Sequence, residues 1–141
     1  MYKIYFDGSP AKNKYLVGLL VIENKVNSKM RNFDKIVYHT VKEVKYPGKI
    51  TNNKAEYLAL IEAIKYADKN NLDDIVFYGD SQLVVYQVNG KYKIKDNELF
   101  SLYKIVTNNL KKFLNARVEW IPRSKNWIVN SLIEGYKSET N

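Results

Sequence analysis

Residues 51–67, TNNKAEYLALIEAIKYA, separate two kinds of hydrophobic pattern in this chain. Within this stretch, small and apolar side chains recur three or four residues apart, as at Ala55, Leu58 and Ala59. This spacing places them on one face and predicts an amphipathic helix from about Asn53 to Ala67. The pattern before this helix favours strands, and the pattern after it alternates between short strands and further helices.

Three strands are predicted ahead of the helix, over Tyr2–Phe6, Tyr15–Glu23 and Lys35–Val44. In each of them successive side chains alternate between two faces, which is the period of a strand. We expect Asp7-Gly8-Ser9-Pro10 to end the first strand, because Gly and Pro interrupt regular structure. Pro47-Gly48 is expected to form a turn before the helix.

After the helix we predict, in order, a strand, a short helix, a longer helix, a strand and a last helix: Asp74–Tyr78, Gln82–Asn89, Asn97 to about Leu114, Ala116–Ile121 and Trp127–Tyr136. This order predicts an α/β fold with a mixed five-stranded sheet flanked by helices, in which three antiparallel strands precede two parallel crossovers. Residues 1–141 are expected to form a single domain. A strand beginning at Tyr2 is expected to leave no room for a preceding domain.

The composition excludes several kinds of site. The 141 residues contain no Cys and one His, so thiolate and His-cluster metal sites are excluded and a bound metal must be held by oxygen. No apolar run approaches the ~18 residues of a membrane span, so we expect a cytoplasmic monomer without membrane contact. The net charge of +8 suits a polyanion such as nucleic acid, although it also suits solubility alone.

Three carboxylates stand at positions where a ligand site is expected. Ligands bind beyond the carboxyl ends of strands in such sheets, which is where Asp7 and Asp80 lie, and Glu56 lies in the first turn of the central helix. Each also has a structural interpretation: Asp7 in a hairpin turn, Glu56 in a capping box with Asn53, and Asp80 as a helix N-cap. If the three converge, their mutual repulsion favours a hard divalent cation, and Mg²⁺ prefers carboxylates with water and phosphate oxygens.

Four blocks stand in the order and spacing of type 1 ribonuclease H: Phe6–Ser9, Thr51–Tyr57, Gly79–Gln82, and Trp120–Arg123 with Asn126. The chain resembles that family over about residues 2–136, and the short segment from Gln87 to Lys95 resembles its compact, archaeal-type members. The resemblance implies hydrolysis of the RNA strand of RNA–DNA hybrids with two Mg²⁺ ions, for which Mn²⁺ can substitute.

The resemblance also assigns roles by position. Asp7, Glu56 and Asp80 resemble the catalytic metal ligands. The groups that contact substrate are expected at Gly8, Ser9, Thr51, Asn52, Asn53 and Gln82, with Thr51 at a DNA phosphate. Arg123 and Lys125 occupy the loop in which some members carry a flexible His, and we expect them to contact substrate too. Trp120 and Trp127 are expected to pack in the core, although they could also stack on bases.

One position departs from the family. Its fourth carboxylate, on the last helix, aligns with Asn130, whose amide oxygen can coordinate Mg²⁺ but brings no negative charge. We therefore expect slower turnover and a greater metal requirement, with substrate binding retained. Two alternatives stay open: a binding module that has lost activity, and a nuclease that also cleaves double-stranded RNA, since both duplexes share A-form geometry and 2′-hydroxyls.

Overall fold

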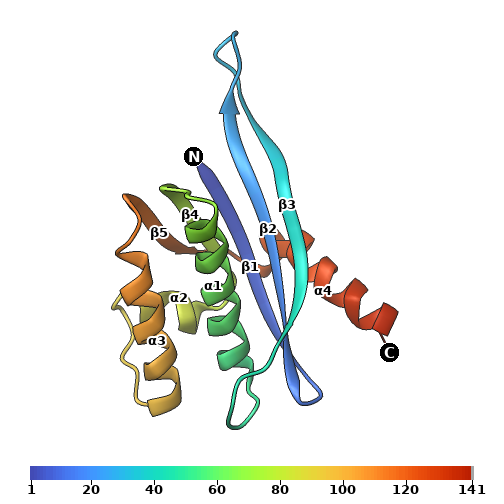
Figure 1. The fold of residues 1–141 in the computed structure, drawn as a ribbon, viewed down its shortest axis with the longest axis vertical. Helices are drawn as coiled ribbons and strands as arrows, with labels where there is room; N and C mark the ends of the chain where they lie inside the picture. The colour runs from blue at the N-terminus through green and yellow to red at the C-terminus, as the bar shows by residue number, and fades with distance from the viewer. Residues whose placement is uncertain (141) are drawn as a thin grey trace.

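The computed structural model describes residues 1–140, and its centre is one mixed sheet (Figure 1). The strands are β1 (Tyr2–Ala11), β2 (Lys14–Val26), β3 (Asn32–Val44), β4 (Asp74–Gly79) and β5 (Asn115–Trp120). They lie in the order β3-β2-β1-β4-β5. The pairs β1–β2 and β2–β3 are antiparallel, whereas β1–β4 and β4–β5 are parallel. The predicted fold class is thereby confirmed.

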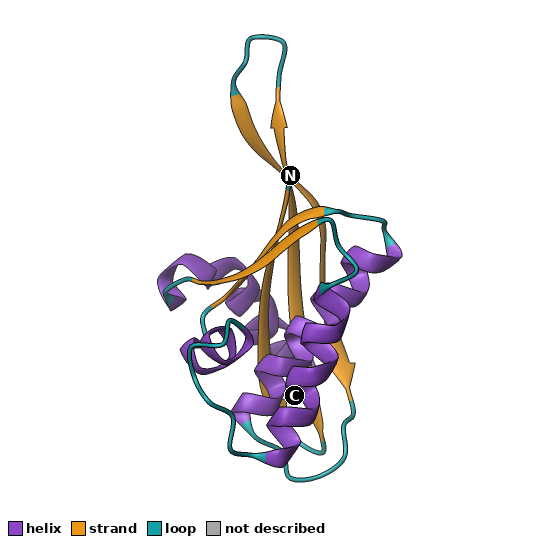
Figure 2. Cartoon of the chain, turned by 90° about the vertical axis from the view of Figure 1, so that its left-hand side faces the viewer, coloured by secondary structure: helices purple, strands orange, loops and turns teal. Residues whose placement is uncertain are grey.

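Helices cover both faces of the sheet (Figures 1 and 2). The helices are α1 (Asn52–Lys69), α2 (Gln82–Val88), α3 (Asn97–Leu110) and α4 (Trp127–Thr140), and a single 3-10 turn spans Arg123–Asn126. The first three lie on one face, and α4 lies on the other (Figure 1). None of the helices within residues 1–140 is long and apolar enough to cross a membrane.

The alternation along β2 divides its buried side chains between these two layers. Val17 and Leu19 join the main core together with residues of α1 such as Leu60. Gly18 faces the other way, where a Cβ would lie 2.9 Å from side-chain atoms of both Val129 and Ile133 of α4. The chain therefore buries β2 on both faces, which explains its nearly continuous apolar sequence.

The first strand is longer than predicted. Asp7-Gly8-Ser9-Pro10 does not end it, because β1 pairs with β2 as far as Ala11↔Lys14. The turn lies at Lys12-Asn13, where Asn13 adopts a φ of 62°; Asn tolerates this left-handed conformation better than most residues. This continuation keeps Asp7 inside a strand, and the hairpin-turn interpretation of Asp7-Gly8 is wrong.

Two other boundaries differ from the prediction. The hairpin of β2 and β3 extends past the end of β1, since Tyr2 pairs with Glu23 while β2 continues to Val26, and it projects from the body (Figure 2). Helix α3 ends at Leu110 rather than near Leu114, whose side chain is exposed. Both differences concern exposed segments, in which hydrophobic periodicity carries little information.

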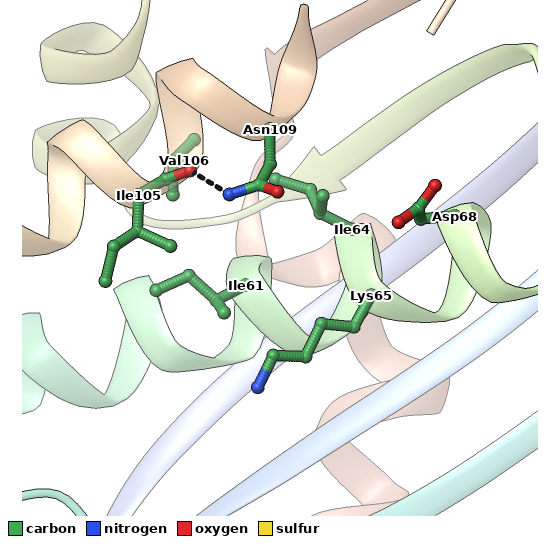
Figure 3. Close-up of a pocket in the computed structure, with 7 residues that line it drawn as sticks. All are labelled: Ile61, Ile64, Lys65, Asp68, Ile105, Val106 and Asn109. Atoms are coloured by element: carbon green, nitrogen blue, oxygen red, sulfur yellow. Dashed lines mark hydrogen bonds between the residues drawn. The ribbon is translucent and has the colours of Figure 1, made fainter. Parts of the chain in front are cut away.

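Helices α1 and α3 pack side by side and leave a small apolar hollow between them (Figure 3). Ile61 and Ile64 of α1 and Ile105 of α3 line it, and the Asn109 amide donates a 2.7 Å hydrogen bond to the Ile105 carbonyl. This hollow contains none of the three candidate carboxylates.

Candidate active site

The three candidate carboxylates converge. Asp7 lies on β1, Glu56 on α1 and Asp80 directly after β4, and each offers an oxygen within 4.8 Å of the others. The parallel register explains why two of them are neighbours, because Tyr5 is opposite Tyr78. Asp7 follows two residues later on β1, and Asp80 follows two residues after Tyr78, just past the end of β4. Side chains two residues apart share a face of a strand, so Asp7 and Asp80 emerge together, as the sequence predicts.

Gly8 brings Glu56 to this point. A Cβ on Gly8 would lie 1.9 Å from the carbonyl oxygen of Ala55, so only glycine allows α1 to approach β1 this closely. The Gly8 N–H then donates a 2.7 Å hydrogen bond to Glu56 Oε1. The close approach of two backbones thus fixes the carboxylate of the helix against the strand.

The capping interpretations of Glu56 and Asp80 are wrong. Thr51 is the N-cap of α1, and its hydroxyl accepts a 3.2 Å bond from the N–H of Lys54. Ser81 caps α2 in the same way, with a 3.2 Å bond from the N–H of Val84. The hydroxyls of Thr51 and Ser81 therefore accept the capping hydrogen bonds at both helix starts. The carboxylates of Glu56 and Asp80 are not used as caps.

Two amides hold the carboxylates in place. Asn130 Nδ2 donates to Asp7 Oδ2 at 2.8 Å and to Asp80 Oδ2 at 3.4 Å. Asn126 Nδ2 donates to Asp80 Oδ2 at 2.9 Å and to the Phe6 carbonyl at 3.1 Å. These bonds orient the Asn126 amide, whose buried Oδ1 has no hydrogen-bond partner within residues 1–140. Asn126 is thus a positioning residue that ties the 3-10 turn to the middle of β1 and to the residue directly after β4.

The electrostatics of the cluster disfavour full ionisation. Burial raises the pKa of Glu56 far above its usual range, and the neighbouring charge of Asp7 raises it further. Burial also raises the pKa of Asp7 and the charge of Asp80 adds to the shift, whereas hydrogen bonds with Glu56 and Asn130 and the positive charge of Arg123 oppose it. A cation among these oxygens would favour the ionised forms. The carboxylate oxygens fit a hard divalent cation, whereas the Asn130 amide presents its nitrogen to the cluster.

Asp7 and Glu56 open into a depression of about 380 Å³ that several predicted substrate residues share. Besides Asp7 and Glu56, it is lined by Gly8, Ser9, Asn52 and Arg123. Asn53 and Gln82 are exposed at the starts of α1 and α2, and Thr51 uses its hydroxyl as the cap. Lys125 lies elsewhere, on a separate hollow beside Trp127.

Lys137 belongs to no motif of the sequence, yet it lines the same depression. Its ammonium donates a 2.7 Å hydrogen bond to Ser9 Oγ and a weaker one of 3.4 Å to Glu134 Oε1. Lys137 is seven residues after Asn130 on α4, so the two share a helical face. The seven-residue spacing from Asn130 on a predicted helix was therefore the feature of the sequence that could have identified Lys137.

The two tryptophans behave differently. Trp120 is half-buried against the core, and its indole N–H donates a 3.1 Å bond to the Asp80 carbonyl, consistent with the predicted packing. Trp127 is 62% exposed at the first position of α4, so the prediction that it packs in the core is wrong.

Comparisons with known proteins agree with this geometry. A family model described as reverse transcriptase-like matches residues 28–134. The chain belongs to this family and is a ribonuclease H-like domain. In the crystal structure of ribonuclease H1 from Halobacterium salinarum, 92% of that chain aligns with 93% of this domain, at 31% identity and a TM-score of 0.76. A ribonuclease H1 solved in complex with an RNA/DNA hybrid aligns over 94% of the domain and 93% of its own chain, at 25% identity and a TM-score of 0.72.

Curated relatives match the ribonuclease H-like domain over shorter stretches. Ribonuclease HI of Halobacterium salinarum is 38% identical over 79 residues, which are 56% of this chain and 40% of the relative. A protein of Mycobacterium tuberculosis named as bifunctional is 35% identical over 85 residues, which are 60% of this chain and 23% of the relative. The matches therefore span less than half the length of either relative.

Proposed function

We propose that this domain is a metal-dependent endoribonuclease that hydrolyses the RNA strand of RNA–DNA hybrids. The observation that carries the proposal is the convergence of Asp7, Glu56 and Asp80, with oxygens within 4.8 Å, at the edge of a depression that also holds Arg123 and Lys137. The partner is supported by the similar ribonuclease H1 that was solved with an RNA/DNA hybrid. Residues 1–141 are proposed to act as one domain.

The proposed cofactor is Mg²⁺, as two ions, with Mn²⁺ as a substitute. Asp7, Glu56, Asp80 and Asn130 would hold it, and a bound pair of such ions activates a water and stabilises the leaving oxygen of a phosphodiester. The chain's part is to keep the carboxylates aligned. The Gly8 N–H fixes Glu56 at 2.7 Å and Asn126 fixes Asp80 at 2.9 Å, so little reorganisation is needed when a substrate phosphate arrives.

The cationic and polar groups of the depression would hold the substrate. Arg123 and Lys137 place positive charge beside the carboxylates, where a backbone phosphate must lie for hydrolysis. Gly8, Ser9 and Asn52 line the same depression, and Thr51, Asn53 and Gln82 stand at helix starts nearby. Hybrids are recognised through A-form shape and 2′-hydroxyl contacts with little sequence dependence, which suits this set of small polar groups.

Asn130 supports a second candidate function, a nucleic-acid-binding module with impaired catalysis. Its amide donates to Asp7 and Asp80, whereas a ligand for a cation would have to present an oxygen. Turning the amide would expose that oxygen but would add no negative charge. We therefore expect weak metal binding and slow turnover, with the substrate surface intact.

The test is cleavage of labelled RNA–DNA hybrid, double-stranded RNA and single-stranded RNA in Mg²⁺ or Mn²⁺ by the parent, Asn130→Asp and Asp7→Asn. Cleavage of the hybrid by the parent or by Asn130→Asp supports the enzyme, and loss of it in Asp7→Asn supports the assignment of the carboxylates. If the parent and Asn130→Asp both bind the hybrid and neither cleaves it, the result would favour the binding module. Equal cleavage of double-stranded RNA would widen the substrate class.

A further inference from the structure

A second hollow adjoins the candidate active site on the α4 side of the sheet. It has a volume of about 200 Å³ and lies between β1, β2 and the start of α4. The aromatic side chains of Tyr5 and Trp127 line it together with the buried Leu20 and Ile22. Lys125, exposed at the same hollow, forms no ion pair within residues 1–140.

Strand β1 and Asn126 connect this hollow to the cluster of carboxylates. Tyr5 precedes Asp7 by two residues, so both side chains stand on one face of β1 about 7 Å apart along the strand. Asn126 links the two places, because it lines the hollow and donates to Asp80 Oδ2. Tyr78 stacks on Tyr5 with ring centroids 5.1 Å apart and likewise precedes Asp80 by two residues. The aromatic side chains of Tyr5 and Tyr78 therefore lie two residues along the chain from the carboxylates of Asp7 and Asp80.

We propose that this hollow receives the base of an unpaired RNA nucleotide that flanks the hybrid, an inference that rests on the proposed function. Aromatic side chains with nearby cations bind bases of single strands by stacking, with little dependence on sequence. The volume is below the roughly 300–1,000 Å³ of pockets that enclose drug-sized ligands, which fits one ring system rather than a whole nucleotide. A paired base is held in its duplex, so the occupant must come from an unpaired flank.

The charges and exposure agree with this occupant. Trp127 is 62% exposed at this hollow, so its indole ring is accessible to a base that enters from solvent. Lys125 stands beside it and would face the phosphate of the same nucleotide. The domain would thereby favour hybrids that end in, or are interrupted by, single-stranded RNA, such as the junctions at the ends of a hybrid tract.

The test compares binding of one hybrid core in three forms, in EDTA so that no strand is cleaved. The core is blunt, carries three unpaired uridines on either end of its RNA strand, or carries the matching extension on its DNA strand. Stacking of one base predicts that an RNA extension tightens binding by roughly tenfold. Trp127→Ala should remove this gain and Trp127→Phe should keep part of it. Phe100→Ala, which removes a 46% exposed aromatic side chain of α3, should retain it in full.

Tryptophan emission gives a second reading on the parent itself. The extended hybrid should quench it more than the blunt hybrid does, and Trp127→Phe, which leaves only Trp120, should lose that difference. Equal affinity of the parent for blunt and RNA-extended hybrids overturns the inference, and so does a gain that survives Trp127→Ala. An equal gain from the DNA extension overturns the choice of RNA.

Failure of the proposed function would be visible separately. Cleavage of the blunt hybrid by the parent or Asn130→Asp decides the enzyme, whereas the ratio of affinities decides the hollow. A Trp127-dependent gain without any cleavage would support the hollow on a binding module. If the protein binds the hybrid and the extension has no effect, the base-binding role of the hollow is rejected and the proposed function of the carboxylate cluster still stands.

Discussion

The side-chain amide of Asn130 donates a 2.8 Å hydrogen bond to the Asp7 carboxylate, at the position where the resemblance to ribonuclease H implies a fourth carboxylate. The same nitrogen lies 3.4 Å from Asp80 Oδ2. The amide thus neutralises part of the repulsion between two acidic groups without a cation. It stabilises the metal-free cluster and competes with a metal for the same oxygens.

Asn130→Asp should reverse both effects. The metal-free variant should have a lower melting temperature than the parent. A further negative charge would replace the amide that donates hydrogen bonds to Asp7 and Asp80. Mg²⁺ should raise that temperature more than it does for the parent, and hybrid cleavage should rise on the order of tenfold, the low end of what a change around a metal site does. Asn130→Ala is the control, since it removes the donor and adds no charge. An unchanged response to Mg²⁺ would show that position 130 does not contact the ion.

The raised pKa of Glu56 makes metal-free stability depend on pH. The folded pKa lies near 10 against about 4.5 for the free group, so the folded state binds more protons than the unfolded state between those values. Stability should therefore fall as the pH rises from about 5 towards 9. Denaturant unfolding in EDTA at pH 5.5, 7 and 8.5 measures this slope.

Glu56→Gln supplies the control for that slope. It keeps the size of the side chain and removes the ionisation, so the fall in stability across this range should be much smaller. Mg²⁺ should also flatten the slope in the parent, because the ion stabilises the carboxylate form. A parent whose stability rises through the same range would contradict the assignment of a buried, protonated Glu56.

The sequence sufficed to predict the convergence of Asp7 and Asp80, because that follows from topology. Two parallel neighbours with carboxylates just after equivalent positions must bring them together, and Tyr5↔Tyr78 is the register found. The course of β1 past Gly8 was not predictable in the same way. Asp-Gly is a favoured turn pair, and the competing role of Gly8, room for the Ala55 carbonyl, depends on a segment 47 residues away in the chain.

The sequence was also insufficient to predict which side chains are exposed and which face the site. Trp127 is the first residue of α4, and its burial depends on whether the sheet continues beneath it. Hydrophobic pattern alone favours the core for any tryptophan, so its exposure required the fold. Lys137 required the phase of α4 relative to Asn130, which becomes fixed once that helix is docked on Gly18 through Val129 and Ile133.

Lys137 should contribute to substrate affinity through charge. Its ammonium lies 2.7 Å from Ser9 Oγ in the depression beside the carboxylates. Lys137→Gln should weaken hybrid binding and reduce the slope of log affinity against log salt by about one, as expected for one phosphate contact. Lys111→Gln, an exposed lysine at the end of α3, is the matched control and should leave the slope unchanged. Equal salt slopes for the parent and Lys137→Gln would show that Lys137 does not contact the substrate.

The contact between Gly8 and α1 predicts an unusually costly alanine. Gly8→Ala would place a methyl group 1.9 Å from the Ala55 carbonyl oxygen, so α1 must move away from β1 and take Glu56 with it. We expect a loss of about 1–3 kcal/mol or more in the free energy of unfolding, together with loss of hybrid cleavage. Thermal unfolding and the cleavage assay measure the two effects.

Gly135→Ala is the matched control for that substitution. Gly135 lies inside α4, and a Cβ there would meet no atom within 4 Å. Alanine is favoured over glycine in a helix interior, so this variant should gain roughly 0.5–1 kcal/mol. Opposite signs for the two glycines would show that the close approach of β1 and α1, rather than glycine content, holds Glu56 in the cluster. A neutral Gly8→Ala with full cleavage would instead mean that α1 can shift without moving the carboxylate.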